Sequence, residues 1–165
     1  MEQLKEQIKA VRQLIKQNNI NELKDYLKDK PELINAETPF GTWLEVAASK
    51  GNLEMVHYFI DSGIDVNKCC GITNGGPLAT AAFNGHLDIV KLLLQNGAII
   101  DVSSSEKNPL FSAIYNGHLE VVKCLAESGI DLKASYEIGS LKNVDAIEYA
   151  RQYGRTEIVN YLKDI

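Results

Sequence analysis

The sequence lacks the long apolar run that a membrane-spanning helix needs. No stretch approaches the ~20 consecutive apolar residues of such a helix. The N-terminal segment, Met1-Glu-Gln-Leu-Lys-Glu-Gln-Ile, alternates charged and apolar residues and has no apolar core of a secretory signal. We therefore expect a cytoplasmic protein that does not act at a membrane.

Cysteine is also scarce. The chain has three cysteines, of which Cys69 and Cys70 are adjacent and Cys124 lies far from them in sequence. An odd number without paired spacing favours free thiols in a reducing compartment. Cys69-Cys70 has no second ligand pair at a zinc-like spacing, so packing is favoured over a metal site. We expect neither a metal nor another cofactor.

Motifs that carry catalysis are missing as well. The sequence has no glycine-rich phosphate loop, no His-Glu-x-x-His, no Cys-x-x-Cys and no nucleophile elbow. We predict no catalytic residues and no enzymatic activity. A hydrolase with an unfamiliar site is the alternative, and it would require titratable groups clustered in a cleft with perturbed pKa values.

The net charge of −5 is concentrated in the middle of the chain. Residues 38–140 contain eleven acidic and six basic residues, whereas both ends are balanced. An acidic surface disfavours nucleic acid and favours a basic protein partner.

Four segments repeat one pattern, each beginning with a glycine. These glycines are 34, 32 and 37 residues apart. A period in the thirties is typical of a solenoid, in which units too small to bury their own apolar faces stack on one another. The long surface of such a stack makes binding the first expectation. The segments are Gly51-Asn-Leu-Glu-Met-Val, Gly85-His-Leu-Asp-Ile-Val, Gly117-His-Leu-Glu-Val-Val and the less regular Gly154-Arg-Thr-Glu-Ile-Val.

The sequence of each unit predicts two helices. In the unit around Gly85, Pro77 suits the first turn of a short helix, and Gly85 permits the positive φ that ends it. A second helix with one apolar stripe follows and ends at Gly97. The predicted stripes are Leu53, Val56, Phe59 and Ile60, then Leu87, Val90, Leu93 and Leu94, then Leu119, Val122, Leu125 and Ala126.

This pattern resembles the ankyrin repeat over about residues 38–165. The family signature, Thr-Pro-Leu-His and Ala-Ala-x-x-Gly-His-x-x-x-Val-x-x-Leu-Leu-x-x-Gly-Ala-Asp-x-Asn, is similar to the three internal units over almost their whole length. The resemblance implies an all-α ankyrin-repeat solenoid of antiparallel helix pairs with protruding hairpin-like fingers. It also implies that His86 and His118, at the Gly-His position, hydrogen-bond to the backbone near the turn.

The two ends predict capping repeats. In residues 1–37, Leu4, Ile8, Val11 and Ile15 form an apolar helical stripe, and Asn18-Asn19 stands at the glycine position. Near the C-terminus, Thr156 and Lys163 replace the apolar residues of the other copies, as expected where nothing stacks further. We expect Trp43 to pack against the N-terminal cap. The predicted single domain comprises a degenerate cap repeat 1–37, full repeats 38–70, 71–103 and 104–140, and a cap repeat 141–165.

The resemblance places the two residues before each glycine on the concave face. Three of the four pairs contain an aromatic residue, and aromatic side chains are favoured at the centres of interfaces. The alternative is that Phe83 and Tyr115 only cover the row of first helices. The pairs are Ser49 and Lys50, Phe83 and Asn84, Tyr115 and Asn116, and Gln152 and Tyr153.

The fingers are expected to extend this surface. The connection after Gly129 is longer than in the family and is either a contact loop or a tolerated insertion. Ser103-Ser104-Ser105 is either a solvated fingertip or a phosphorylation or cap motif. The finger residues predicted to bind are Thr73, Asn74, Ser104, Glu106, Lys107, Tyr136, Glu137 and Lys142.

The leading hypothesis is a non-catalytic protein-binding module that is monomeric when free. Its size and its Asn, Lys and Ile content resemble those of stand-alone bacterial ankyrin proteins. Some of these are immunity proteins, so the resemblance and the acidic middle together suggest masking of a basic toxin or enzyme. An adaptor that joins two cellular proteins is the alternative.

Overall fold

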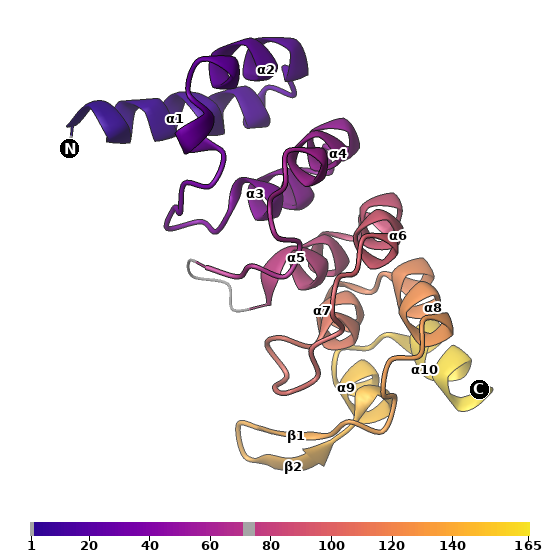
Figure 1. The fold of residues 1–165 in the computed structure, drawn as a ribbon. Helices are drawn as coiled ribbons and strands as arrows, with labels where there is room; N and C mark the ends of the chain where they lie inside the picture. The colour runs from indigo at the N-terminus through magenta and orange to yellow at the C-terminus, as the bar shows by residue number, and fades with distance from the viewer. Residues whose placement is uncertain (1, 71–74) are drawn as a thin grey trace.

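The protein is a stack of helix pairs joined by short turns (Figure 1). The structure, a computed structural model, describes residues 2–70 and 75–165. Within these residues one small two-stranded sheet accompanies the helices. The elements are α1 (Glu2–Lys16), α2 (Ile20–Lys28), the 3₁₀ helix η1 (Pro31–Leu33), α3 (Trp43–Lys50), α4 (Leu53–Asp61), α5 (Gly76–Asn84), α6 (Leu87–Gln95), α7 (Pro109–Asn116), α8 (Leu119–Glu127), β1 (Tyr136–Ile138), β2 (Leu141–Val144), α9 (Ala146–Gln152) and α10 (Thr156–Lys163).

The helices form two rows. The inner row consists of the first helix of each pair, α1, α3, α5, α7 and α9, and each contacts the next in that order. The outer row contains the second helices, in which α4, α6, α8 and α10 contact one another in turn. Figure 1 shows the connections between pairs projecting from the inner-row side, which is the geometry expected of fingers. The predicted all-α ankyrin-repeat solenoid is therefore confirmed, with β1 and β2 as a local addition.

The turn within a pair depends on a left-handed residue. Gly51, Gly85 and Gly117 have φ of 73°, 74° and 79° and cap α3, α5 and α7. A residue with a Cβ adopts this conformation at a cost of about 1–2 kcal/mol, so glycine is the natural choice. In the N-terminal pair Asn18 takes this role with φ 55°, as the sequence predicted.

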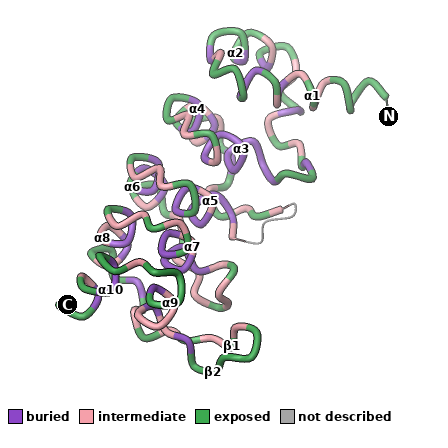
Figure 2. Tube along the Cα trace, turned by 180° about the vertical axis from the view of Figure 1, so that it is seen from behind, coloured by how far each residue is buried: buried purple, intermediate pink, exposed green. Residues whose placement is uncertain are grey.

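The core runs continuously between the two rows, as the buried segments in Figure 2 show. The predicted apolar stripe of the outer helices is partly wrong. Its first residue lies at the rim of the stack, with Leu53 37% exposed, whereas Met55, two residues later, is fully buried. Each outer helix contacts its own inner helix and its outer neighbours, so its buried face is wider than one stripe. Ile89 and Val121 repeat the position of Met55 and are also buried.

This rim position changes the meaning of Thr156. Thr156 aligns with Leu53, Leu87 and Leu119, and none of these three is fully buried. A polar residue there is therefore no sign that stacking stops.

The N-terminal pair packs onto the rest through its own stripe and through Trp43. Val11 and Ile15 are fully buried, while Leu4, near the free end of α1, is 49% exposed. The Trp43 side chain is completely buried, and its Nε1 donates a hydrogen bond of 2.7 Å to the Leu33 carbonyl. The predicted packing of Trp43 against the N-terminal cap is confirmed.

Two fingers have defined hydrogen-bonded turns. In the first finger, residues 38–41, the Thr38 hydroxyl donates to the Gly41 carbonyl at 2.8 Å and accepts from the Phe40 N–H at 3.1 Å. The connection after Gly129 forms the antiparallel hairpin of β1 and β2, with Tyr136 opposite Val144. None of the described helices is long and apolar enough to cross a membrane.

Candidate functional site

Three aromatic side chains form a continuous exposed row at the ends of the inner helices. Phe83 and Tyr115 stack with their ring centroids 5.9 Å apart and their planes 16° apart. Tyr115 meets Tyr153 edge to face at 4.8 Å. Phe83 is 45% exposed, and Tyr115 and Tyr153 are each 41% exposed. We call these three residues the aromatic row.

The turns of the following repeats hold this row in place. The Phe83 carbonyl accepts hydrogen bonds from Asn116 Nδ2 at 2.6 Å and from His118 Nε2 at 3.1 Å. Arg155 stands where two of the other repeats have His86 and His118, and its Nε donates to the Tyr115 carbonyl at 3.2 Å. The predicted backbone hydrogen bond of His118 is confirmed. The backbone at Phe83 and at Tyr115 is therefore fixed by the repeat that follows each of them.

Behind the exposed row, aromatic rings continue into the protein. Tyr153 contacts Tyr149, Tyr149 contacts Phe111, and Phe111 contacts Tyr136, with centroid distances of 4.8, 4.6 and 4.9 Å. Burial raises the pKa of the Tyr149 and Tyr136 hydroxyls above the usual tyrosine value, because the anion would be poorly solvated.

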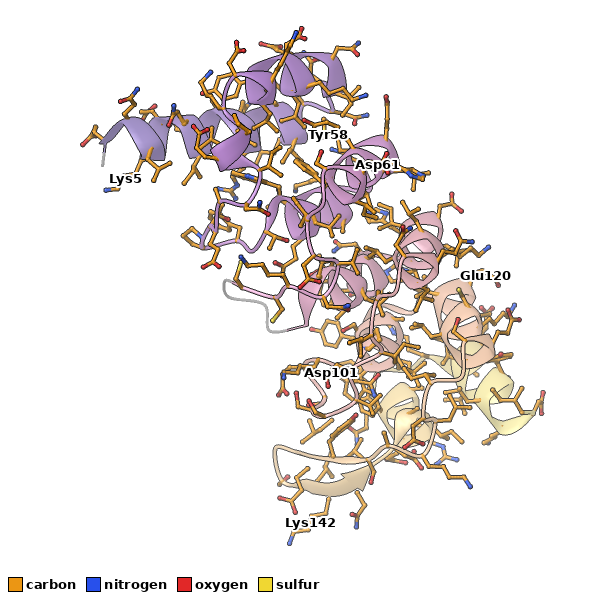
Figure 3. The ribbon with its side chains drawn as sticks, in the orientation of Figure 1. Lys5, Tyr58, Asp61, Asp101, Glu120 and Lys142 are labelled. Carbon is orange, nitrogen blue, oxygen red and sulfur yellow. The ribbon has the colours of Figure 1, made fainter. Side chains whose placement is uncertain are left out.

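Tyr136 differs from the rim residue that the sequence predicted. Its hydroxyl donates to the Val102 carbonyl at 2.8 Å and accepts from Asn108 Nδ2 at 2.9 Å. The ring packs edge to face on Phe111 and so fastens the hairpin to the preceding finger. A side chain with these contacts supports the surface from below instead of projecting from it. Glu137 and Lys142, in the same hairpin, are exposed, and Figure 3 shows Lys142 at its outer side.

The remaining predicted residues of the concave face differ in exposure. The Ser49 hydroxyl is half-buried and donates to the Val46 carbonyl at 2.8 Å. Asn84 is exposed, and its Nδ2 donates to the Thr80 carbonyl at 2.8 Å. Thr73 and Asn74 lie outside the described residues. Lys50 and Gln152 are exposed, and Asn116 is half-buried.

In the third finger, which is the connection between α6 and α7, the serines act as local hydrogen-bond donors. Hydrogen bonds from its own backbone N–H and from the Ser104 side chain lower the pKa of Glu106. Hydrogen bonds from Ser103 lower the pKa of Asp101, and Lys107 pairs with Asp101 at 3.4 Å. These contacts favour the cap interpretation of the serine run. Lys107 and Glu106 thus already have partners within the finger.

The acidic residues of the middle segment lie mostly outside the inner helices. Within the described part of the chain, Glu45 is the single acidic residue of α3, α5 and α7, and it is only 1% exposed. The exposed carboxylates of residues 38–140 lie on the outer helices, in the turns after them and in the fingers. Figure 3 shows two of them, Asp61 on α4 and Glu120 on α8. The acidic charge that suggested a basic partner therefore lies on the outer row and the fingers, and not on the exposed surface of α3, α5 and α7.

The cysteines and other potential ligands form no metal centre. No group of three or more His, Cys, Asp or Glu side chains that could hold a metal ion occurs in the part of the chain that the structure describes. Burial raises the pKa of the Cys70 and Cys124 thiols, which keeps them protonated and poorly nucleophilic.

The sequence reasoning predicted Ser49 and Lys50 for the binding surface but missed the side chains that line a pocket together with them. The Arg12 guanidinium lies 3.4 Å from the centroid of the Phe40 ring, so α1 contacts the first finger. Arg12, Lys16, Ser49, Lys50 and Thr80 line one pocket together with Phe40. The helical spacing of Lys9, Arg12 and Lys16 would have indicated this basic face of α1.

Paired helices, left-handed glycine turns and projecting fingers define a class of stacked-repeat proteins. A family model described as "Ankyrin repeats (3 copies)" matches residues 44–136, more than half of the chain. The chain belongs to the ankyrin repeat family.

Individual relatives match about half of this chain. A putative ankyrin repeat protein of Rickettsia felis (strain ATCC VR-1525 / URRWXCal2) is 32% identical over 90 residues, which is 54% of this chain and 34% of that protein. The E3 ubiquitin-protein ligase hecd-1 of Caenorhabditis elegans is 37% identical over 93 residues, 56% of this chain but 3% of its own length. Cortactin-binding protein 2 of Rattus norvegicus is 38% identical over 68 residues, 41% of this chain and 4% of that protein. The chain thus spans about a third or less of the length of these relatives.

Ankyrin repeats are protein–protein interaction modules, and this chain is such a module. The family is typically non-catalytic.

Proposed function

We propose that this chain is a non-catalytic binding protein that holds its protein partner on the inner row, with the aromatic row at the centre of the interface. The observation that carries the proposal is the exposure of Phe83, Tyr115 and Tyr153 as one contiguous line. Aromatic side chains supply large contact area at a small entropic cost, and they are over-represented among residues that dominate binding energy.

Two further features support this surface. The backbone at Phe83 and Tyr115 is held by the following repeat and the three rings contact one another, so binding has less to order. Polar side chains flank them, with Asn84 beside Phe83 and Gln152 beside Tyr153. An apolar centre with a polar surround is the usual anatomy of a protein interface.

The alternative, that the rings merely cover the inner helices, leads to a different outcome of mutation. We expect the double variant F83A/Y115A to lose the partner while its circular dichroism spectrum and melting temperature stay close to those of the wild type. Leu4 and Leu53, which are 49% and 37% exposed away from the aromatic row, provide a matched control variant, L4A/L53A. If stability and binding fall together in F83A/Y115A, the rings are structural and the proposal is wrong.

Two possible roles, an immunity protein and an adaptor, differ in the partner that they bind and in the surface that holds it. An immunity or inhibitor protein for a basic toxin would have to meet its partner with the outer row and the fingers, where the exposed carboxylates are. An adaptor would bind one partner on each row.

Affinity purification followed by mass spectrometry tests both roles. It should compare the wild type, F83A/Y115A and the outer-row variant E54Q/D61Q/E120Q. A toxin-like partner that only the outer-row variant loses supports the immunity role. Two partners, each lost with a different variant, support the adaptor. A single partner lost with F83A/Y115A alone contradicts both of them and leaves the inner-row proposal standing.

A further inference from the structure

The N-terminal half of the inner row contains a pocket unlike the aromatic row. It has a volume of about 330 Å³ and lies between α1, the first finger, α3 and the middle of α5. Arg12 and Lys16 reach it from α1, and Lys50 reaches it from α3. Ser49 and Thr80 add hydroxyl groups, and the Phe40 ring forms an apolar wall.

The cations of this pocket are available to a ligand. Arg12, Lys16 and Lys50 make no ion pair with any carboxylate in the described residues. The Arg12 guanidinium instead contacts the Phe40 ring, with Cζ 3.4 Å from its centroid, and this contact leaves the N–H groups to other acceptors. One carboxylate, Glu45, also lines the pocket, but it is 1% exposed.

Glu45 is committed to its own helix. Its Oε2 accepts a hydrogen bond of 2.7 Å from the Thr42 N–H, and its own N–H donates to the Thr42 hydroxyl at 3.2 Å. This reciprocal pair caps α3. The pocket therefore has an excess of positive charge at its surface.

The walls of the pocket are pre-formed. Phe40 is held at the tip of the first finger, where its N–H donates to the Thr38 hydroxyl. Gly41 follows with φ of 96° and returns the chain toward Thr42. Because the finger is closed by the bonds between Thr38 and Gly41, the position of Phe40 against α1 does not depend on a ligand.

The pocket and the aromatic row share one face of α5. Thr80, Phe83 and Asn84 are spaced i, i+3 and i+4 on α5 and thus lie on one face of that helix. A single extended segment that contacts Phe83 would therefore pass Thr80 and reach the three cations.

We infer that the partner presents to the inner row a segment with apolar side chains for the aromatic row and, beside them, a cluster of carboxylates for the pocket of Arg12, Lys16 and Lys50. This inference rests on the proposed function, since it describes the segment that the aromatic row would bind. It is the opposite of the basic partner that the net charge suggested. The sign of the partner's charge follows from charge complementarity, because three unpaired cations on a pre-formed wall favour an acidic ligand and repel a basic one.

A phage-displayed library of random dodecapeptides provides a probe that needs no known partner. It should be selected separately on the wild type, on R12Q/K16Q/K50Q and on the control K28Q/K91Q/K163Q. The control removes the same charge from exposed lysines of the outer helices α2, α6 and α10. We expect peptides from the wild type and the control to combine aromatic or aliphatic residues with an excess of Asp and Glu. Peptides from R12Q/K16Q/K50Q should keep the apolar residues and lose the acidic excess.

The affinity of one selected acidic peptide, measured by fluorescence anisotropy, gives the magnitude. Each exposed ion pair contributes a factor of about 1.5–5, so the triple variant should bind about threefold to a hundredfold more weakly. The wild-type affinity should fall as sodium chloride is raised, because salt screens exposed charges. If R12Q disturbs the Phe40 contact and the triple variant fails to fold, K16Q/K50Q should show the same change to a smaller degree.

The outcomes distinguish this inference from the proposed function. An acidic excess that is absent, or that persists unchanged in R12Q/K16Q/K50Q, overturns the inference even if the peptides still need Phe83 and Tyr115. Peptides that bind F83A/Y115A as well as the wild type overturn the proposed function. Failure to select any peptide that depends on either set overturns both.

Discussion

Replacing Gly85 by alanine should cost more stability than the same change at Gly97, and His118 should be the reason. Both glycines are left-handed, with φ of 74° and 84°. A Cβ on Gly85 would lie 2.5 Å from Nδ1 of His118, whereas a Cβ on Gly97 meets no described atom within 4 Å. The two variants therefore share the backbone strain and differ in the contact between repeats.

The magnitudes follow from these contacts. The left-handed conformation costs an alanine about 1–2 kcal/mol, offset by about 0.4–1 kcal/mol because the unfolded chain loses freedom. We expect G97A to destabilise the protein by about 1 kcal/mol. In G85A the imidazole must also move and give up its hydrogen bond to the Phe83 carbonyl. Such a bond is worth about 0.5–1.5 kcal/mol, and the carbonyl keeps its bond from Asn116, so the extra cost should be near 1 kcal/mol.

Urea denaturation measures these differences. Circular dichroism reports all helices, and the fluorescence of the buried Trp43 reports the junction with the N-terminal pair. The two transitions must coincide, because repeat arrays can unfold in parts. In the background H118A the extra cost of G85A should disappear, since the smaller side chain leaves room for the Cβ. Equal costs for G85A and G97A, or an extra cost that persists in H118A, would refute the role assigned to His118.

Two further predictions concern the half-buried tyrosines Tyr136 and Tyr149. Y136F removes hydroxyl bonds to Val102 and Asn108, so it should destabilise the protein by about 1–3 kcal/mol and speed hydrogen exchange in β1 and β2. The exposed hairpin variant K142Q is its control, and unchanged exchange would contradict the anchoring role. The raised pKa values of Tyr136 and Tyr149 mean that the unfolded chain ionises first as pH rises. Stability should therefore be fully present below about pH 10 and be lost above it. Y149F should shift alkaline unfolding, followed by tyrosinate absorbance, to higher pH, and an unchanged midpoint would count against this explanation.

Local sequence patterns predicted the fold well because the helix ends and turns of the repeat are set by residues close together in the chain. The glycine period, the proline at the start of α5 and the left-handed Asn18 each act within one turn of the chain. The predicted outer-helix stripe failed at Met55 because burial there depends on contacts with neighbouring helices, which one helix's periodicity does not contain.

The candidate site was only partly predictable for the same reason. Phe83, Tyr115 and Tyr153 could be found because each stands one or two residues before the glycine of its repeat. Their stacking into one line, and the inward packing of Tyr136 on Phe111, depend on side chains from different repeats. The contact between Arg12 and Phe40 joins two segments with no shared motif, so no repeat alignment could have revealed it.

The sequence by itself determined the repeating unit and the order of the units, since turns and helix ends are set by residues that are neighbours along the chain. Only the tertiary structure decided where the charges lie. Net composition made the middle of the chain acidic, but the two-row stack turned its exposed carboxylates outward and into the fingers and left Arg12, Lys16 and Lys50 on the inner row. The physical reason is that electrostatic attraction depends on distance and burial, and both are fixed only when the helices pack.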